Sequence, residues 1–93
     1  MTRRVAVIAH PPDAGWHGPL RAFLENRARE LRDDSAVRRA RVVEHDPPAL
    51  TLIIEFAHEY GATELLRDVV ADLEALNAAP RTAGHPDAVS HVP

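Results

Sequence analysis

The chain has 93 residues, 45% of them hydrophobic, and a net charge of −3. This length allows at most one domain, which buries only about 60–65% of the surface that the unfolded chain exposes, so we expect a small stability margin. The absence of cysteine excludes disulfides and thiolate zinc sites. No apolar run approaches the ~20 residues of a membrane-spanning helix, and no signal-peptide pattern is present. We therefore expect a cytoplasmic protein with no membrane partner.

The charges are distributed unevenly along the chain. Residues 1–45 carry nine arginines against six acidic residues, a net charge of +3. Residues 46–93 carry two arginines against eight acidic residues, a net charge of −6. Such a distribution can orient two molecules as they meet.

The arginines of the first half are the candidates for contacts with phosphate. They are Arg27, Arg29, Arg32, Arg38, Arg39 and Arg41. Acidic residues interrupt this cluster, so we interpret it as the solvated face of a helix. Aromatic residues, on which nucleic-acid bases stack, make up only 4% of the chain. We therefore expect no nucleic-acid partner.

The first half of the chain predicts a strand, a helix and a second strand. Residues 3–9, RRVAVIA, are a short apolar run that is typical of a buried strand and ends before three residues that include two prolines. A helix is predicted at residues 19–33, because apolar side chains recur there on one face. Residues 38–44, RRARVVE, are the second strand candidate.

Residues 49–60 fit two secondary structures equally well. As a helix, the segment has Asp46 as its N-cap and Pro47 in its first turn, and Gly61 ends it. As a strand, it follows a turn at residues 46–48 and has high β-propensity and strict alternation. The alternating apolar positions are Leu50, Leu52, Ile54 and Phe56.

Residues 63–77 predict an amphipathic helix with a wide apolar stripe. Within the stripe we expect four residues to be buried against the strands at residues 5–9 and 40–43. They are Leu66, Val69, Val70 and Leu73. From residue 78 the periodicity is lost and prolines accumulate, which indicates a flexible tail over residues 78–93 that follows a domain at 1–77. Residues 87–92 are a weak candidate for an edge strand.

The order of these elements predicts an α+β domain of two layers, β-α-β followed by two apolar helical segments. The strand interpretation of residues 49–60 gives a ferredoxin-like βαββα arrangement instead.

Five polar residues could in principle form a site, namely His10, Asp13, His17, His58 and Glu59. The segment AHPPD at residues 9–13 is similar to the AHPDD signature of PIG-L-type zinc deacetylases, but a proline replaces the first acidic position. No histidines have metal-ligand spacing, and adjacent helical residues do not face each other. We therefore predict no catalytic residue, no metal and no cofactor, and we favour a non-enzymatic role.

An interface is predicted in the central segment, because it carries apolar residues on nearly every side and a chain of this size has little core to cover them. The candidate interface residues are Leu52, Ile53, Phe56 and Tyr60. As a strand, the same segment would expose Ile53 and Ala57. We expect a protein partner or a homo-oligomer.

Two stretches within residues 3–76 suggest a family. LRAFLENRARELRDDSAVRRARVVEHDPPAL, followed by LIIEFAHEYGATELLRDVVADL, resembles the effector-associated constant component family of actinobacteria. The resemblance implies a non-enzymatic adaptor module, encoded beside variable effector enzymes in bacterial conflict systems. It also favours a helix for the central segment.

Two other functions stay open on the sequence. A small-molecule-binding regulatory domain of the ACT type would need a βαββ arrangement and a dimer whose interface forms the ligand site. A small enzyme would need a pocket that gathers at least two of the five polar residues, centred on the loop between His10 and His17.

Overall fold

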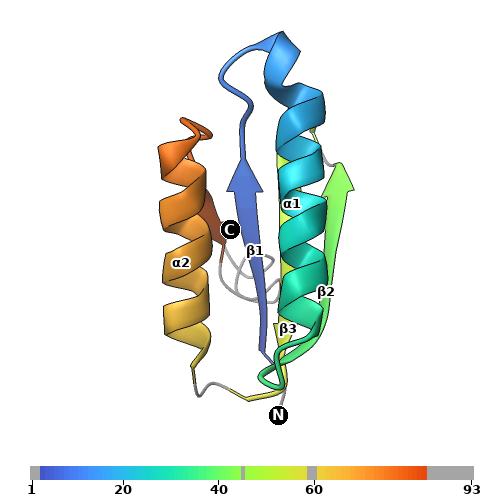
Figure 1. Cartoon of the computed structure of the whole chain (residues 1–93), viewed down its shortest axis with the longest axis vertical. Coiled ribbons are helices and arrows are strands. Elements are labelled where there is room, and N and C mark those ends of the chain that lie inside the picture. The colour runs from blue at the N-terminus through green and yellow to red at the C-terminus, as the bar shows by residue number, and fades with distance from the viewer. Residues whose placement is uncertain (1–2, 45, 59–60, 84–93) are drawn as a thin grey trace, which may run out of the picture.

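The computed structural model describes residues 3–44, 46–58 and 61–83. The strands are β1 (Arg3–Ala9), β2 (Val37–Glu44), β3 (Leu50–Phe56) and β4 (Arg81–Ala83). The helices are the short 3₁₀ helix η1 (Ala14–Trp16) and the α-helices α1 (His17–Arg32) and α2 (Ala62–Ala75). Along this part of the sequence, the elements follow in the order β1, η1, α1, β2, β3, α2 and β4 (Figure 1).

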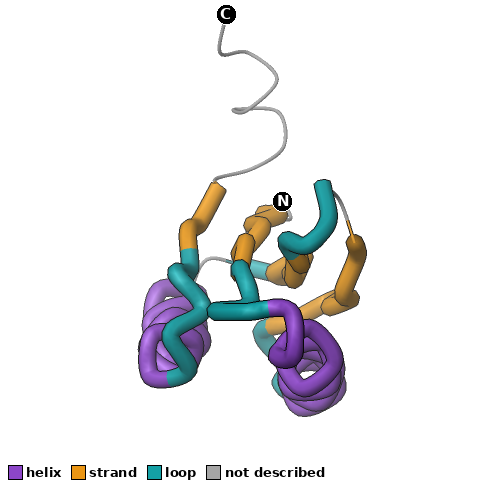
Figure 2. The backbone as a smooth tube through the Cα atoms, turned by 90° about the horizontal axis from the view of Figure 1, so that it is seen from above, coloured by secondary structure: helices purple, strands orange, loops and turns teal. Residues whose placement is uncertain are grey.

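The strands form one antiparallel sheet in the order β2-β3-β1-β4. This order, with a helix after β1 and another after β3, is the ferredoxin-like βαββαβ topology. Both α-helices lie on the same side of the sheet (Figure 2). The predicted α+β class with two layers is confirmed. Within it, the structure matches the ferredoxin-like alternative, with a fourth strand added.

The helix predicted for residues 49–60 is wrong, because residues 50–56 form strand β3 in the middle of the sheet. β3 pairs with β1 on one side and with β2 on the other, so its backbone groups are satisfied by both neighbours. A helix there would leave β1 and β2 without the strand that joins them. Gly61 does not end a helix; it precedes α2 with a φ of 80°, in the left-handed region that favours glycine.

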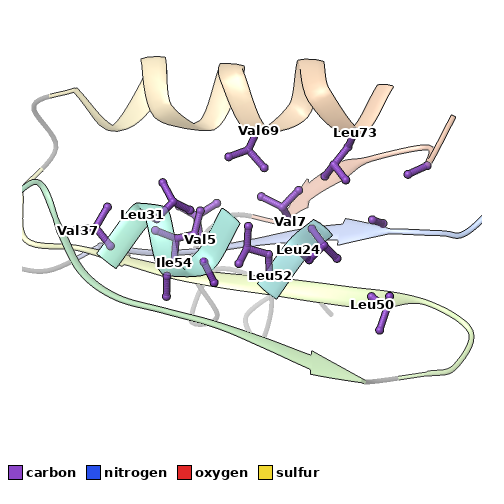
Figure 3. Packing of buried hydrophobic residues seen from close by; sticks show 14 of the residues in the cluster. Val5, Val7, Leu24, Leu31, Val37, Leu50, Leu52, Ile54, Val69 and Leu73 are labelled. Carbon is purple, nitrogen blue, oxygen red and sulfur yellow. The ribbon is translucent and has the colours of Figure 1, made fainter. Parts of the chain in front are cut away.

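The core lies between the sheet and the two helices (Figure 3). Every second residue of β3 faces this layer and is fully buried, which accounts for the strict alternation in the sequence. α1 contributes Leu20, Leu24, Ala28 and Leu31, on the face that the periodicity predicted. The alternating residues of β3 are Leu50, Leu52, Ile54 and Phe56.

Helix α2 packs less deeply than predicted. Val69 and Leu73 are buried, whereas Leu66 and Val70 are only partly buried at the margin of the core. The predicted contact of α2 with the strand at 40–43 is wrong, because β2 is the far edge of the sheet and lies beneath α1 (Figure 1). Neither α-helix is long and apolar enough to cross a bilayer.

The tail predicted from residue 78 is wrong for its first six residues. Ala78 is fully buried, and its carbonyl accepts a hydrogen bond from the His10 N–H at 2.7 Å. Residues 81–83 then form β4, which pairs with β1. The edge strand proposed at residues 87–92 lies outside the described residues.

Candidate functional site

Among the described elements, no helix covers the face of the sheet that points away from α1 and α2 (Figure 2). We call this the open face. The strand register assigns eleven residues to it, because cross-strand neighbours share a face. They are Arg4, Ala6, Ile8, Arg39, Arg41, Val43, Thr51, Ile53, Glu55, Arg81 and Ala83.

Two kinds of side chain are separated on the open face. A strip of small and aliphatic residues runs across the four strands, and all of them are half-buried apart from Thr51, which is buried. Arginines flank this strip on both edge strands, β2 and β4. The residues of the strip are Ala6, Ile8, Val43, Thr51, Ile53 and Ala83.

One end of the open face is hollowed where β2, β3 and β1 meet the end of α1. The hollow has a volume of about 340 Å³. Five arginines and one glutamate provide its charged lining, so we call it the arginine depression. Its residues are Arg4, Arg32, Arg38, Arg39, Ala40, Arg41, Ile53 and Glu55.

Glu55 forms ion pairs with two of these arginines. Its carboxylate lies 3.5 Å from Arg4 Nη2 and 3.9 Å from Arg38 Nε, and its side chain is only 14% exposed. Arg39 is also its cross-strand neighbour on β2. Arg38 reaches the same face as Arg39 because the register of β2 shifts between Val37 and Arg39, where a β-bulge re-aims side chains.

The other three arginines have no acidic partner among the described residues. Arg32 reaches from the last turn of α1 to the edge of β2, where its Nη1 donates a hydrogen bond to the Ala40 carbonyl at 2.9 Å. Arg39 and Arg41 are exposed, and neither makes an ion pair or a side-chain hydrogen bond with any residue that the structure describes.

The polar residues that the sequence singled out are not gathered in one site. His10, Asp13 and His17 lie near the end of the sheet where β1 finishes, whereas His58 follows β3 at the opposite end. Asp13 accepts a hydrogen bond from the Gly15 N–H at 2.9 Å. His17 lies against the Glu44 carboxylate, with 2.7 Å between Nε2 and Oε1. Glu59 lies outside the described residues.

These contacts are the ones expected of a turn and of surface ion pairs. In the described part of the chain, no three histidine or acidic side chains are placed to hold a metal ion.

The residues predicted to form an interface in the central segment differ in their burial. Leu52 and Phe56 are fully buried beneath the helices, so the prediction is wrong for them. Ile53 lies at the centre of the open face, and Ala57 is exposed, as the strand interpretation required. Tyr60 lies outside the described residues.

The arginine depression was not predicted from the sequence, because the arginine cluster as a whole was interpreted as a solvated helix face although residues 38–44 were also predicted to be a strand. Arg39 and Arg41 are two residues apart in a strand, and this spacing was a usable signal that they share a face. No local signal connects Arg4 and Arg32 to them, because only the strand register and the path of α1 bring these residues together.

Comparisons with known proteins found no family model, no curated protein and no solved structure that matches this chain.

Proposed function

We propose that this protein is a non-enzymatic interaction module that docks a protein partner on the open face of its sheet. The observation that carries the proposal is the apolar strip, which lies on three full-length strands and β4 and which neither α-helix covers. A strip of half-buried aliphatic side chains with a polar rim is the usual composition of a protein interface.

The charges of the open face favour a partner with an acidic surface. Among the residues that the structure describes, this face carries five arginines against one acidic residue, Glu55. The arginines are Arg4, Arg38, Arg39, Arg41 and Arg81. If two copies met through the same face, their arginines would be opposed, and like charges across an interface cost free energy. An acidic partner would instead be attracted and oriented by these arginines.

The resemblance to the effector-associated family would make this partner an effector protein encoded beside the chain in a bacterial genome. The role of the open face does not depend on this resemblance, because the apolar strip and its arginines are sufficient to support it.

The test is isothermal titration calorimetry between the purified chain and the protein encoded beside it. Ile53→Asp places a charge at the centre of the strip, and we expect it to weaken binding at least about tenfold, because central interface residues carry most of the binding energy. Ala71→Asp is the matched control, since Ala71 is exposed on α2, on the other side of the sheet. Equal binding by wild type and Ile53→Asp would overturn the proposal.

A regulatory domain of the ACT type is a second candidate, because the βαββ arrangement that it requires is present. Such a domain would form its ligand site at a dimer interface. Light scattering over a concentration series separates the two candidates, since the docking module needs no dimer of its own.

A further inference from the structure

Guanidinium groups from three different elements line the arginine depression. Arg4 comes from β1, Arg32 from α1, and the remaining three from β2. We propose that the depression is a binding site for a small molecule that bears a phosphate or diphosphate group. This inference goes beyond the docking of a protein partner and does not rest on it.

The charge of the depression requires a counterion. Five positively charged arginines and one acidic residue, Glu55, are the charged side chains that line the depression in the described part of the chain, so this lining carries a net charge of +4. Like charges that line one hollow repel one another. An anion with two or more negative charges would offset this repulsion, whereas a single chloride would offset little of it.

Three of the guanidinium groups are already held in place. Glu55 holds Arg4 and Arg38, and the Ala40 carbonyl holds Arg32. Each guanidinium has five N–H donors, so these contacts leave most of the donors available to a ligand. Groups that are positioned before binding lose less conformational entropy when the ligand arrives, which strengthens binding.

A purely protective role explains only part of this cluster. Charged residues on an edge strand prevent the sheet from pairing with another chain, and β2 is an edge strand. That role would account for Arg38, Arg39 and Arg41. It does not account for Arg32, which belongs to α1, or for the ion pair that holds the Arg4 side chain against Glu55 of β3.

The size and chemistry of the depression select the class of ligand. Its volume of about 340 Å³ is near the lower end of the range of roughly 300–1,000 Å³ that small-molecule sites occupy. The planar guanidinium donates two parallel hydrogen bonds to a phosphate group, which is why arginine predominates in phosphate recognition. A diphosphate offers enough oxygen atoms to engage several of the five arginines at once.

The test uses inorganic pyrophosphate and the full chain. We expect pyrophosphate to raise the melting temperature above that in sodium chloride of the same ionic strength, and to show saturable binding by calorimetry. Equal melting temperatures in the two salts, with no heat of binding, would overturn the proposal.

Substitutions of arginine test whether pyrophosphate binds in the arginine depression. Arg39→Gln with Arg41→Gln changes two exposed side chains that make no ion pair or side-chain hydrogen bond with any residue that the structure describes. We expect this double variant to bind pyrophosphate at least about tenfold more weakly, because a hydrogen bond to a charged group contributes more than a factor of ten. Arg67→Gln is the control, since Arg67 is an exposed arginine on α2 outside the depression. A double variant that binds as well as Arg67→Gln would overturn the assignment to the depression.

A parallel titration with ADP distinguishes the sources of the phosphate group. Tighter binding of ADP than of pyrophosphate would identify an organic phosphate as the ligand, and the reverse order would identify the inorganic anion. Either order supports the proposal, and binding of neither anion contradicts it. None of these measurements involves a protein partner, so they can succeed or fail independently of the docking experiment.

Discussion

The same strands form both faces of the sheet, but the two faces differ in burial and in charge. On the face beneath the helices, the residues of β3 are fully buried aliphatic and aromatic side chains. On the open face, the alternating residues of the same strand are Thr51, Ile53 and Glu55, and arginines lie on the neighbouring strands. The first face supplies the stability of the domain. The second face carries charged side chains and half-exposed apolar side chains that the stability of the domain does not require. We therefore propose that a binding partner contacts this face.

The largest expected effect comes from substituting two adjacent residues of β3, one on each face. Leu52→Thr shortens a fully buried side chain and places a hydroxyl in the core, so we expect it to lower the free energy of unfolding by about 3 kcal/mol. Ile53→Thr keeps a β-branched side chain on the half-buried open face, and we expect a cost below about 1 kcal/mol. Urea denaturation measures both values.

Equal costs for these two substitutions would contradict the assignment of the faces. A larger cost for Ile53→Thr would mean that the open face is itself packed against something in solution, and light scattering on the same samples would show whether a second copy covers it.

A smaller effect is expected from Glu55→Gln, which removes the carboxylate that lies among the described residues of the arginine depression and keeps the shape of the side chain. Arg4 and Arg38 lose their ion pairs and the repulsion among five arginines increases, so we expect a loss of about 1 kcal/mol at low salt. High salt should reduce this loss by screening the repulsion.

Thermal unfolding with and without 0.5 M sodium chloride, about three times the physiological ionic strength, checks this prediction. Glu74→Gln serves as the control, because Glu74 is exposed in the last turn of α2, where a negative charge is unfavourable to the helix dipole. We expect this control to be neutral or slightly stabilising. A salt-independent loss in Glu55→Gln would show that Glu55 acts by packing and not by charge.

The smallest effect is expected from the ion pair that joins the two helices. Arg27 pairs with Asp72 across the outer surface of the helical layer, and its guanidinium also lies 5.6 Å from the centre of the Phe23 ring. Both partners are partly exposed, so Asp72→Ala should cost only about 0.5 kcal/mol. Arg27→Ala should cost more, about 1 kcal/mol, because the contact with the ring is also lost. A double-mutant cycle isolates the ion pair, and a coupling energy as large as the effect of Leu52→Thr would contradict the order of effects expected here.

Local patterns predicted the first strand and both α-helices. β1 occupies the residues of the predicted first strand, and α1 and α2 differ from their predicted ranges by at most two residues at each end. The periodicity of a helix is a local property, because its hydrogen bonds join residues four apart. The buried face of α1 was predictable for the same reason.

The candidate site was predictable only in fragments. Ile53 was identified as a surface residue under the strand interpretation. Arg39 and Arg41 were identified as possible contacts for phosphate and lay in a predicted strand, although the arginine cluster as a whole was interpreted as a solvated face. Arg4 was not connected with them at all. It lies about 35 residues earlier in the chain, and only the pairing of β1 and β2 with β3 places it beside Glu55.

The sequence by itself therefore determined the two-layer α+β class, the first strand, both long helices and the alternation that β3 uses to form two different faces. The tertiary structure alone decided that residues 50–56 are a strand, that residues 81–83 join the sheet, and that five arginines share one depression. The physical reason is that a strand satisfies its backbone hydrogen bonds with residues far away in the chain. The apolar pattern of residues 49–60 fitted a helix and a strand equally. The segment forms a strand because it pairs with both β1 and β2 in the sheet.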